Sequence, residues 1–347
     1  MRVISAKLQE KYQHYFKYEV LKDVNIYLIN APVNSPGLEY IFLSFLIEDK
    51  KNNKNILIEV GPGSSSATLH RTIESIGVQK IDYILLTHIH ADHAGGIGHL
   101  IKYYPEAMVY AQEKGRKHLI NPDRLWEGSI KALGKELTDA YDRMLGVPEK
   151  NILHEEPKIE GLTILDTPGH ASHHNSFVLD KEGIQLIFSG EACGMIYGDE
   201  ERKLVIKEGI DAKPAYTYLY PAAIPRFEYA IYEGSLNKLI NIAQDNCYIF
   251  YSHYGVAMNG KTMLDLHKNQ IRLWRDIAIE ETKEYIDSGH TELNDAFIKK
   301  VTQRILEEDQ LLEDYKNYRQ EVQRFQYTYI YGSVHGFVDW AMRFHLE

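Results

Sequence analysis

One stretch of this 347-residue chain indicates its fold: Thr87-His88-Ile89-His90-Ala91-Asp92-His93-Ala94-Gly95-Gly96. It places three imidazoles and one carboxylate within six residues, directly after the apolar run at residues 81–86. Neutral imidazoles and carboxylates bind Zn²⁺, Fe or Mn²⁺, and an H-x-H-x-D-H spacing at the end of a strand can serve two adjacent metals. The chain has only 16 histidines, so chance does not explain three of them beside this aspartate. The stretch therefore predicts a metal site.

Four further motifs share one pattern, in which an apolar run ends at a turn or at a possible ligand. A buried strand that delivers a side chain to the edge of a sheet has this pattern, so ligands from separate strands can converge. The motifs are Ile56-Leu57-Ile58-Glu59-Val60-Gly61-Pro62-Gly63, Asp166-Thr167-Pro168-Gly169-His170, Phe188-Ser189-Gly190-Glu191 and Tyr251-Ser252-His253-Tyr254-Gly255.

In this order, the five motifs resemble those of the metallo-β-lactamase-fold hydrolases, over about residues 20–256. The resemblance implies an α/β fold, namely an αββα sandwich of two sheets with helices on both outer faces. It also implies a set of metal ligands, with Glu59 steadying them from outside the coordination sphere. The first metal would be held by His88, His90 and His170, the second by Asp92, His93 and His253, and Glu191 would bridge the two.

The resemblance implies a metal-dependent hydrolase that attacks an ester-like bond with a metal-bound hydroxide, which Asp92 would orient. Two metals about 3.5–4 Å apart can lower the pKa of a shared hydroxide towards neutrality and polarise the substrate's oxygen. Small thioesters, lactones and phosphodiesters all remain open, because the family distinguishes them by loops. The motifs look closest to the thioesterase and lactonase branches. Zinc is the expected metal, and Fe or Mn²⁺ stays open because the set contains no thiolate.

The chain departs from the family at two positions, where Glu59 and Glu191 replace the usual Asp. One added methylene moves a carboxylate by about 1.5 Å. A bridging Glu191 therefore needs a displaced backbone or a different metal separation, and otherwise it ligates one metal only. Cys193 lies two residues further on, and a lone cysteine is more typical of a small buried hydrophobe than of a ligand.

Two alternatives belong to other functional classes. A non-haem di-iron protein could reduce, activate or sense oxygen on a similar scaffold. However, relatives with that chemistry tend to carry Glu where this chain has His90, and no electron-donating flavin region is visible. A binding protein that keeps the metal site as a relic would be expected to have lost ligands, and none is missing here.

Composition favours a cytoplasmic enzyme with a small-molecule substrate. No apolar run of about eighteen residues and no charged-then-apolar secretory start is present, so neither membrane insertion nor secretion is expected. The two cysteines, Cys193 and Cys247, make no disulfide framework. The net charge of −10 disfavours nonspecific binding of phosphate backbones, so nucleic acid is not the expected partner.

The pattern is α/β to residue 256, predicting a catalytic domain over 1–256, and helical over 257–347. Helices are expected at 65–76 and 97–104, with a helical insert at 112–150 and an aromatic, proline-containing loop at 213–233 that could form a substrate wall. The helical extension should break near Ser288-Gly289 and Tyr331-Gly332, where Tyr331 and His335 are expected to be packing residues. Its apolar stripes, one of which includes His267, predict packing over the cleft, a homodimer interface, or both. Strands are expected at 24–29, 40–48, 55–60, 81–87, 108–111, 162–165, 176–179, 185–188 and 248–251.

Overall fold

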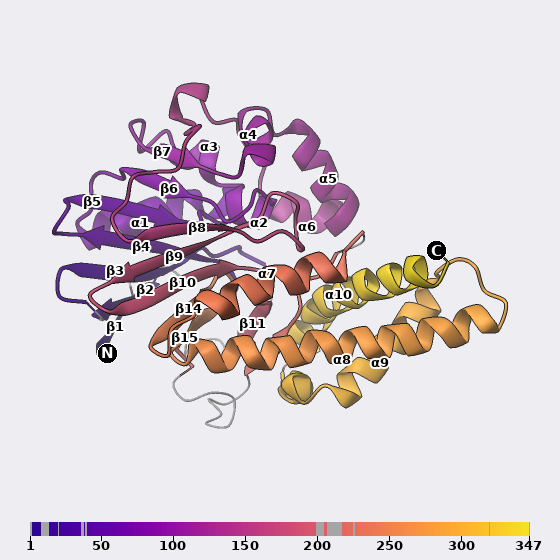
Figure 1. Cartoon of the computed structure of the whole chain (residues 1–347). Helices are drawn as coiled ribbons and strands as arrows, with labels where there is room; N and C mark the ends of the chain where they lie inside the picture. The colour runs from indigo at the N-terminus through magenta and orange to yellow at the C-terminus, as the bar shows by residue number, and fades with distance from the viewer. Residues whose placement is uncertain are drawn as a thin grey trace. The chain divides into compact units, whose positions relative to one another are not determined.

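A computed structural model describes residues 2–7, 14–19, 21–35, 38, 40–198, 205–206, 217–224, 226–318 and 320–346 (Figure 1). The chain forms two compact units, each continuous in space but not in sequence. The first unit comprises Met1–Asp166, His173–Gly190 and Ser252–Tyr254, and the second comprises Thr167–Ser172, Glu191–Tyr251 and Gly255–Glu347. The division into domains at residue 256 stays a prediction.

A seven-stranded sheet dominates the first unit, and its strands follow one another in sequence order. Strands β1 to β5 pair antiparallel, whereas β5, β6 and β7 are parallel. The carboxyl ends of parallel strands lie at one sheet edge, which is where Glu59 and the histidine-rich stretch follow their strands. The bounds are β1 Arg2–Lys7, β2 His14–Glu19, β3 Val24–Asn30, β4 Leu43–Asp49, β5 Lys54–Ile58, β6 Tyr83–Leu85 and β7 Met108–Tyr110.

The two faces of this sheet are covered by different layers. On one face lies the antiparallel ribbon of β8 (Leu162–Asp166), β9 (Asn175–Lys181) and β10 (Ile184–Gly190), and the rings of Phe45 and Phe188 meet there at 5.4 Å. The neighbouring Leu46 points to the opposite face because side chains alternate along a strand. There it joins the core formed with helices α1 (Ser66–Ile76) and α3 (Ile97–Leu100), in which Leu69 and Ile73 are fully buried.

The predicted helical insert is confirmed as three short helices, α4 (Glu113–Ile120), α5 (Asp123–Leu133) and α6 (Lys135–Ala140). Trp126 of α5 is buried, and the guanidinium of Arg143 lies 5.8 Å from the centre of its ring. Shorter elements of the first unit are η1 (Gly63–Ser65), α2 (Ala91–Ala94) and η2 (Glu149–Asn151).

The second unit combines short strands with long helices, as the labels in Figure 1 show. Its strands form two small groups: β11 (Met195–Gly198) pairs with β13 (Thr217–Tyr220), while β15 (Gly255–Ala257) lies between β14 (Cys247–Tyr251) and β12 (Val205–Ile206). Helix α10 packs against α8, and the rings of Trp274 and Phe337 meet between them at 5.6 Å in a tilted arrangement. The helical elements are α7 Tyr229–Ile242, α8 Gly260–Asp287, α9 Asp295–Glu308, η3 Gln310–Asn317 and α10 Gln320–Leu346.

Most of the elements predicted from the sequence are confirmed. The nine expected strands correspond to β3 to β10 and β14, with ends shifted by a few residues, and the extension is helical. Helix α8 ends as expected, with Gly289 in a left-handed conformation at φ +94°. The break expected near Tyr331-Gly332 is wrong, because α10 continues through it. Glycine in a helix costs about 1 kcal/mol relative to alanine, and the buried face of Ile330, Val334 and Phe337 offsets this.

The structure describes Tyr331 and His335, which were expected to be packing residues, but only part of the aromatic segment 213–233. Tyr331 donates a hydrogen bond of 2.8 Å to Asp295 and so connects α10 to α9, and the ring of His335 lies 6.4 Å from that of Tyr331. Of the aromatic segment 213–233, residues 213–216 and 225 lie outside the described residues. In its described part Phe227 packs on Phe337 at 4.8 Å. The role of this segment as a substrate wall stays a prediction.

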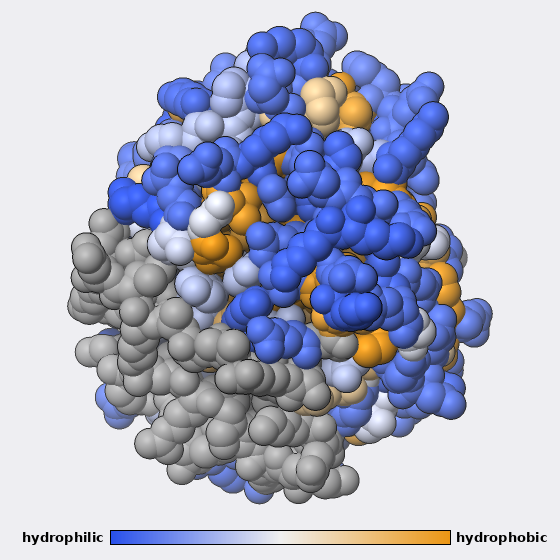
Figure 2. Space-filling view, turned by 90° about the vertical axis from the view of Figure 1, so that its left-hand side faces the viewer, coloured by the Kyte–Doolittle hydropathy of each residue, from blue (hydrophilic) through white to orange (hydrophobic). Residues whose placement is uncertain are grey.

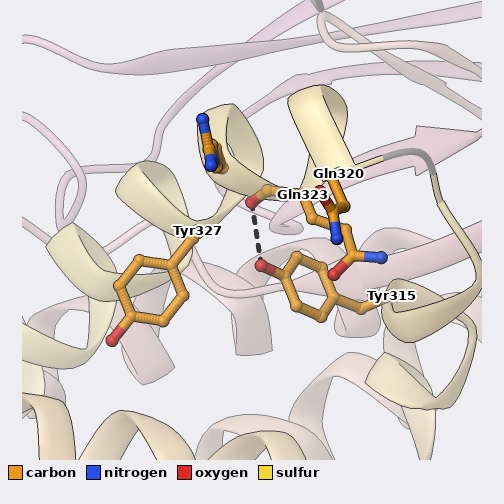
Figure 3. A pocket seen from close by; sticks show the side chains of 5 residues that line it. Tyr315, Gln320, Gln323 and Tyr327 are labelled. Atoms are coloured by element: carbon orange, nitrogen blue, oxygen red, sulfur yellow. Dashed lines mark hydrogen bonds between the residues drawn. The ribbon is translucent and has the colours of Figure 1, made fainter.

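None of the helices in the described part of the chain combines the length and the apolar character needed to cross a bilayer. Hydrophilic residues predominate on the face shown in Figure 2, where hydrophobic residues form separate patches. A pocket of about 370 Å³ lies where η3 meets α10. It is lined by Tyr315, Gln320, Gln323, Arg324 and Tyr327, and Tyr315 donates a 2.8 Å bond to the carbonyl of Gln323 across it (Figure 3).

Candidate metal centre

The histidine-rich stretch begins directly after β6, at the carboxyl edge of the parallel strands. His90 caps helix α2, and its carbonyl accepts bonds from the N–H groups of His93 and Ala94 at 3.0 and 2.9 Å. This tight turn places His93 beside His88, with their ring centres 4.0 Å apart. His88 and His93 are buried, whereas His90 and Asp92 are partly open to solvent.

His253 reaches the same part of the first unit from far along the chain. Residues 252–254 pair with the start of β4, through a bridge between Phe42 and His253 and bonds of 3.1 Å on either side. The extended pairing fixes where His253 projects, although 160 residues separate it from His93. His253 is 1% exposed, so its ring is held by packing on all sides.

Within the first unit, the predicted ligands form two close sets. His88 Nε2 lies 3.1 Å from His90 Nδ1. In the second set, Asp92 Oδ2, His93 Nε2 and His253 Nε2 form a triangle with sides of 3.6, 3.8 and 3.2 Å. Tetrahedral Zn²⁺ with Zn–N bonds of about 2.05 Å needs nitrogens about 3.3 Å apart. The spacing and the donor types therefore fit divalent metal ions.

The nitrogens on the far side of these rings have partners of their own. His88 Nδ1 lies 3.1 Å from the hydroxyl of Thr87, and His93 Nδ1 lies 3.6 Å from Glu59 Oε2. Each ring thus turns Nε2 towards the donor cluster, because a metal-binding imidazole is oriented through its other nitrogen.

Glu59 connects these outer partners. Its carboxylate is fully buried and accepts hydrogen bonds from the N–H of Thr87 at 3.2 Å, from the Thr87 hydroxyl and from Ser252 at 3.4 Å. Its backbone is left-handed at φ +60°, which is uncommon for a residue other than glycine. Glu59 therefore lies 3.6 Å from His93, and its role in steadying the metal ligands stays a prediction.

The remaining two predicted ligands, His170 and Glu191, belong to the second unit. His170 Nε2 lies 2.6 Å from Glu191 Oε2, and both side chains are buried. His170 Nδ1 donates to the carbonyl of Ala222 at 3.0 Å, so Nε2 is the nitrogen that faces Glu191. The hydroxyl of Tyr232 lies 3.1 Å from the carbonyl of Glu191, and burial raises the pKa of this phenol, so that it stays protonated.

Sequence reasoning missed two histidines beside the ligands. His174 is fully buried, with its ring 5.1 Å from that of His88, and the ring of His173 lies 5.6 Å from that of His90. A Cβ added at Gly190 would come within 2.4 Å of His174 Nε2, so this position requires glycine. The signal was present in the sequence, because His173 and His174 follow His170 in one short run.

The chain is similar in sequence to several known proteins. The model of the metallo-beta-lactamase superfamily matches residues 43–237. A metallo-beta-lactamase fold-containing protein of Sulfurisphaera tokodaii is 28% identical over 215 residues, which cover 58% of this chain and 70% of the relative. A probable metallo-hydrolase of Methanocaldococcus jannaschii is 34% identical over 39% of this chain and 60% of its own length. An atrochrysone carboxyl ACP thioesterase of Passalora fulva is 29% identical over 39% of this chain and 34% of its own.

The fold has counterparts among solved structures. The crystal structure of a metallo-beta-lactamase superfamily protein from Sulfolobus tokodaii superposes with a TM-score of 0.57 at 20% identity. The match covers 90% of this chain and 97% of that protein, so it includes most of the helical region.

Proposed function

The chain belongs to the metallo-β-lactamase superfamily, and we propose on this basis that it is a binuclear metal-dependent hydrolase of an ester-like bond. It has the superfamily's fold, with an added C-terminal helical region. Relatives that are named metallo-hydrolases and thioesterases support the reaction class. Among the ester-like bonds, we place the thioester first and the lactone and phosphodiester after it.

The observation that carries the proposal is the donor triangle of Asp92, His93 and His253. Three donor atoms 3.2–3.8 Å apart, two of them on buried imidazoles, form a set with the spacing that one divalent metal requires. His88 and His90 form a second, adjacent pair in the same unit. This duplication supports the proposal of two metals rather than one.

The division of ligands that we propose is the one that the resemblance implies. The first metal takes His88, His90 and His170, and the second takes Asp92, His93 and His253. The close approach of His170 and Glu191 in the second unit, at 2.6 Å, supports a shared environment for these two. Glu191 would then bridge the metals, and zinc is the metal we propose, with Fe or Mn²⁺ as alternatives.

The protein's own groups would prepare the site for hydrolysis. When bound, two metals supply a nucleophile at neutral pH and a Lewis acid for the substrate's oxygen. Asp92 is the partly exposed carboxylate of the set, with 14% of its side chain accessible, so it can orient the attacking water on the solvent side. Glu59, by contrast, is buried and holds Thr87 and the ring of His93 in place.

The experiment is metal analysis followed by a substrate panel. Protein purified without added metal is analysed for its elements and its visible spectrum, because Zn²⁺ is silent and iron is not. It is then assayed on small thioesters, lactones and phosphodiesters, next to His253→Ala and the matched control His154→Ala, an exposed histidine. We expect thioester turnover that the His253 variant loses and the His154 variant keeps. Absence of bound metal and of turnover with added Zn²⁺, Fe²⁺ or Mn²⁺ would refute the proposal.

The assembly and the location stay predictions from the sequence. We propose a cytoplasmic homodimer, formed through the helical region. Exposed Ile224, Ile231 and Phe344 in the second unit support an apolar contact surface there, at 39%, 49% and 57% accessibility.

A further inference from the structure

A chain of buried polar side chains runs through the second unit from the main chain of Glu191 to Asp309. The hydroxyl of Tyr232 on α7 lies 3.1 Å from the carbonyl of Glu191 and 3.0 Å from Nε2 of His267 on α8. His267 Nδ1 in turn lies 3.1 Å from Oε1 of Gln270. Gln270 and Trp274 both donate to Asp309 Oδ2 at 2.7 Å. All of these groups except the carbonyl belong to side chains that are at most 4% exposed.

The direction of the hydrogen bonds follows from Gln270. Its Nε2 donates to the carbonyl of Leu219 at 2.5 Å and to Asp309 at 2.7 Å, which uses both amide hydrogens. Its Oε1 can then only accept, so His267 carries its proton on Nδ1 and offers a lone pair at Nε2. Burial lowers the pKa of His267 to about 4, which agrees with a neutral ring at pH 7.

Tyr232 consequently has one proton and two acceptors. The carbonyl of Glu191 and the lone pair of His267 lie at almost equal distances from its oxygen, and the N–H of Ala222 faces the same oxygen at 3.5 Å. The carbonyl of Ala222 also accepts the bond from His170. Tyr232 therefore sits at the junction between the main chain of Glu191 and the residue that orients His170.

Two glycines show how closely Tyr232 and His267 pack against the turns that carry His170 and Glu191. A Cβ at Gly169, which precedes His170, would come within 2.7–2.9 Å of three atoms of Tyr232. A Cβ at Gly194, three residues after Glu191, would come within 2.7 Å of the ring of His267. Both glycines have positive φ, so a side chain at either position would be strained as well as crowded.

We propose that Tyr232 and His267 are positioning residues of the metal centre, which hold the turns of Glu191 and His170 through a network anchored at Asp309. The inference rests on the function proposed above, because it assigns these two turns to metal binding. On this inference the C-terminal helical region helps to position the metal ligands, since His267 lies on α8 and Asp309 caps η3.

The test uses full-length variants that change one polar group each. Tyr232→Phe removes the hydroxyl and keeps the ring against Gly169. His267→Phe removes both ring nitrogens, whereas His267→Gln keeps an acceptor for Tyr232. Tyr220→Phe is the matched control, because it deletes another buried hydroxyl of the same unit, bonded to Gln326 at 3.3 Å.

We expect Tyr232→Phe and His267→Phe to lower the affinity for Zn²⁺ in chelator competition by about 10-fold to 100-fold, as loss of an outer partner of a metal ligand typically does. The visible spectrum of the Co²⁺-substituted protein should change in the same variants. His267→Gln and Tyr220→Phe should keep both readouts close to those of the unchanged protein.

The possible results distinguish a failure of this inference from a failure of the proposed function on which it rests. If the unchanged protein takes up no Zn²⁺ or Co²⁺, the proposed function fails. If it takes up metal, and Tyr232→Phe and His267→Phe leave the affinity and the spectrum unaltered, this inference alone is overturned. Should Tyr232→Phe lack the native circular dichroism, the comparison of His267→Phe with His267→Gln decides, and equal affinities in those two would refute it.

Discussion

Replacing His267 by Gln should remove a large part of the acid sensitivity of the second unit. Burial lowers the pKa of His267 from 6.5 to about 4 in the folded protein. As the pH falls below 6.5, His267 takes up a proton in the unfolded chain but stays neutral in the folded protein. The contribution of His267 to stability is therefore complete above pH 6.5 and is lost progressively as the pH falls towards 4.

The magnitude follows from these two pKa values. Between pH 7 and pH 5, linkage gives a loss of about 2 kcal/mol in the free energy of unfolding from this one ring. Asp309 acts in the opposite direction, because burial raises the pKa of its carboxyl and the folded protein takes up that proton first. Asp309 is present in both proteins, so the difference between the unchanged protein and His267→Gln isolates the histidine.

The assay is urea unfolding at pH 7, 6 and 5 with a chelator present, so that metal release adds nothing. Tryptophan fluorescence is a suitable probe, because Trp274 shares the buried network with His267. The unchanged protein should lose about 2 kcal/mol more than the variant over this range. His154→Gln, at an exposed position, should behave like the unchanged protein. Parallel pH profiles for the unchanged protein and His267→Gln would refute the reasoning.

Four further outcomes are expected. Elemental analysis should give two divalent metals per chain, and one metal would contradict the binuclear proposal. Glu191→Gln should weaken the second metal more than the first in chelator titrations, because it removes a negative charge from between two dications; unchanged metal content and turnover would make Glu191 a spectator. Glu59→Asp should lower Zn²⁺ affinity by about 10-fold, since the carboxylate no longer reaches its partners, and an unaltered affinity would contradict this. Light scattering should give the mass of a dimer, and truncation after Asn259 should expose apolar stripes and reduce solubility; a monomer with a soluble truncated form would contradict both.

The strands and the ligand loop could be predicted because their signal is local. An apolar run that ends at His88 or at Glu59 can be recognised without knowledge of the strands that pair with it. Strands β6 and β5 lie where such runs were expected. The strands β1 and β2 could not be predicted in this way, because polar residues interrupt them, and β11 and β13 pair across many intervening residues. Their pairing depends on partners that local periodicity does not reveal.

The network behind Glu191 shows a second limit. Helical spacing places His267 in the apolar stripe of α8, where it is indistinguishable from a packing residue. The role that we propose for it depends on Tyr232, which lies 35 positions away on α7, and on Asp309, which follows α9. Only the tertiary structure reveals that a buried histidine in an apolar stripe has hydrogen-bond partners on both nitrogens.

A left-handed residue lies at or directly before each of the two glutamates that stand where the resemblance implies aspartate. Glu59 has φ +60°, and Gly190, which directly precedes Glu191, has φ +56°. A left-handed residue at the end of a strand turns the chain there. The left-handed conformation costs a residue other than glycine about 1–2 kcal/mol. Glu59 offsets this through its buried bonds to Thr87 and Ser252. Backbone and side chain are therefore matched at this position, and restoring aspartate alone would leave the strained backbone while shortening the group that it serves.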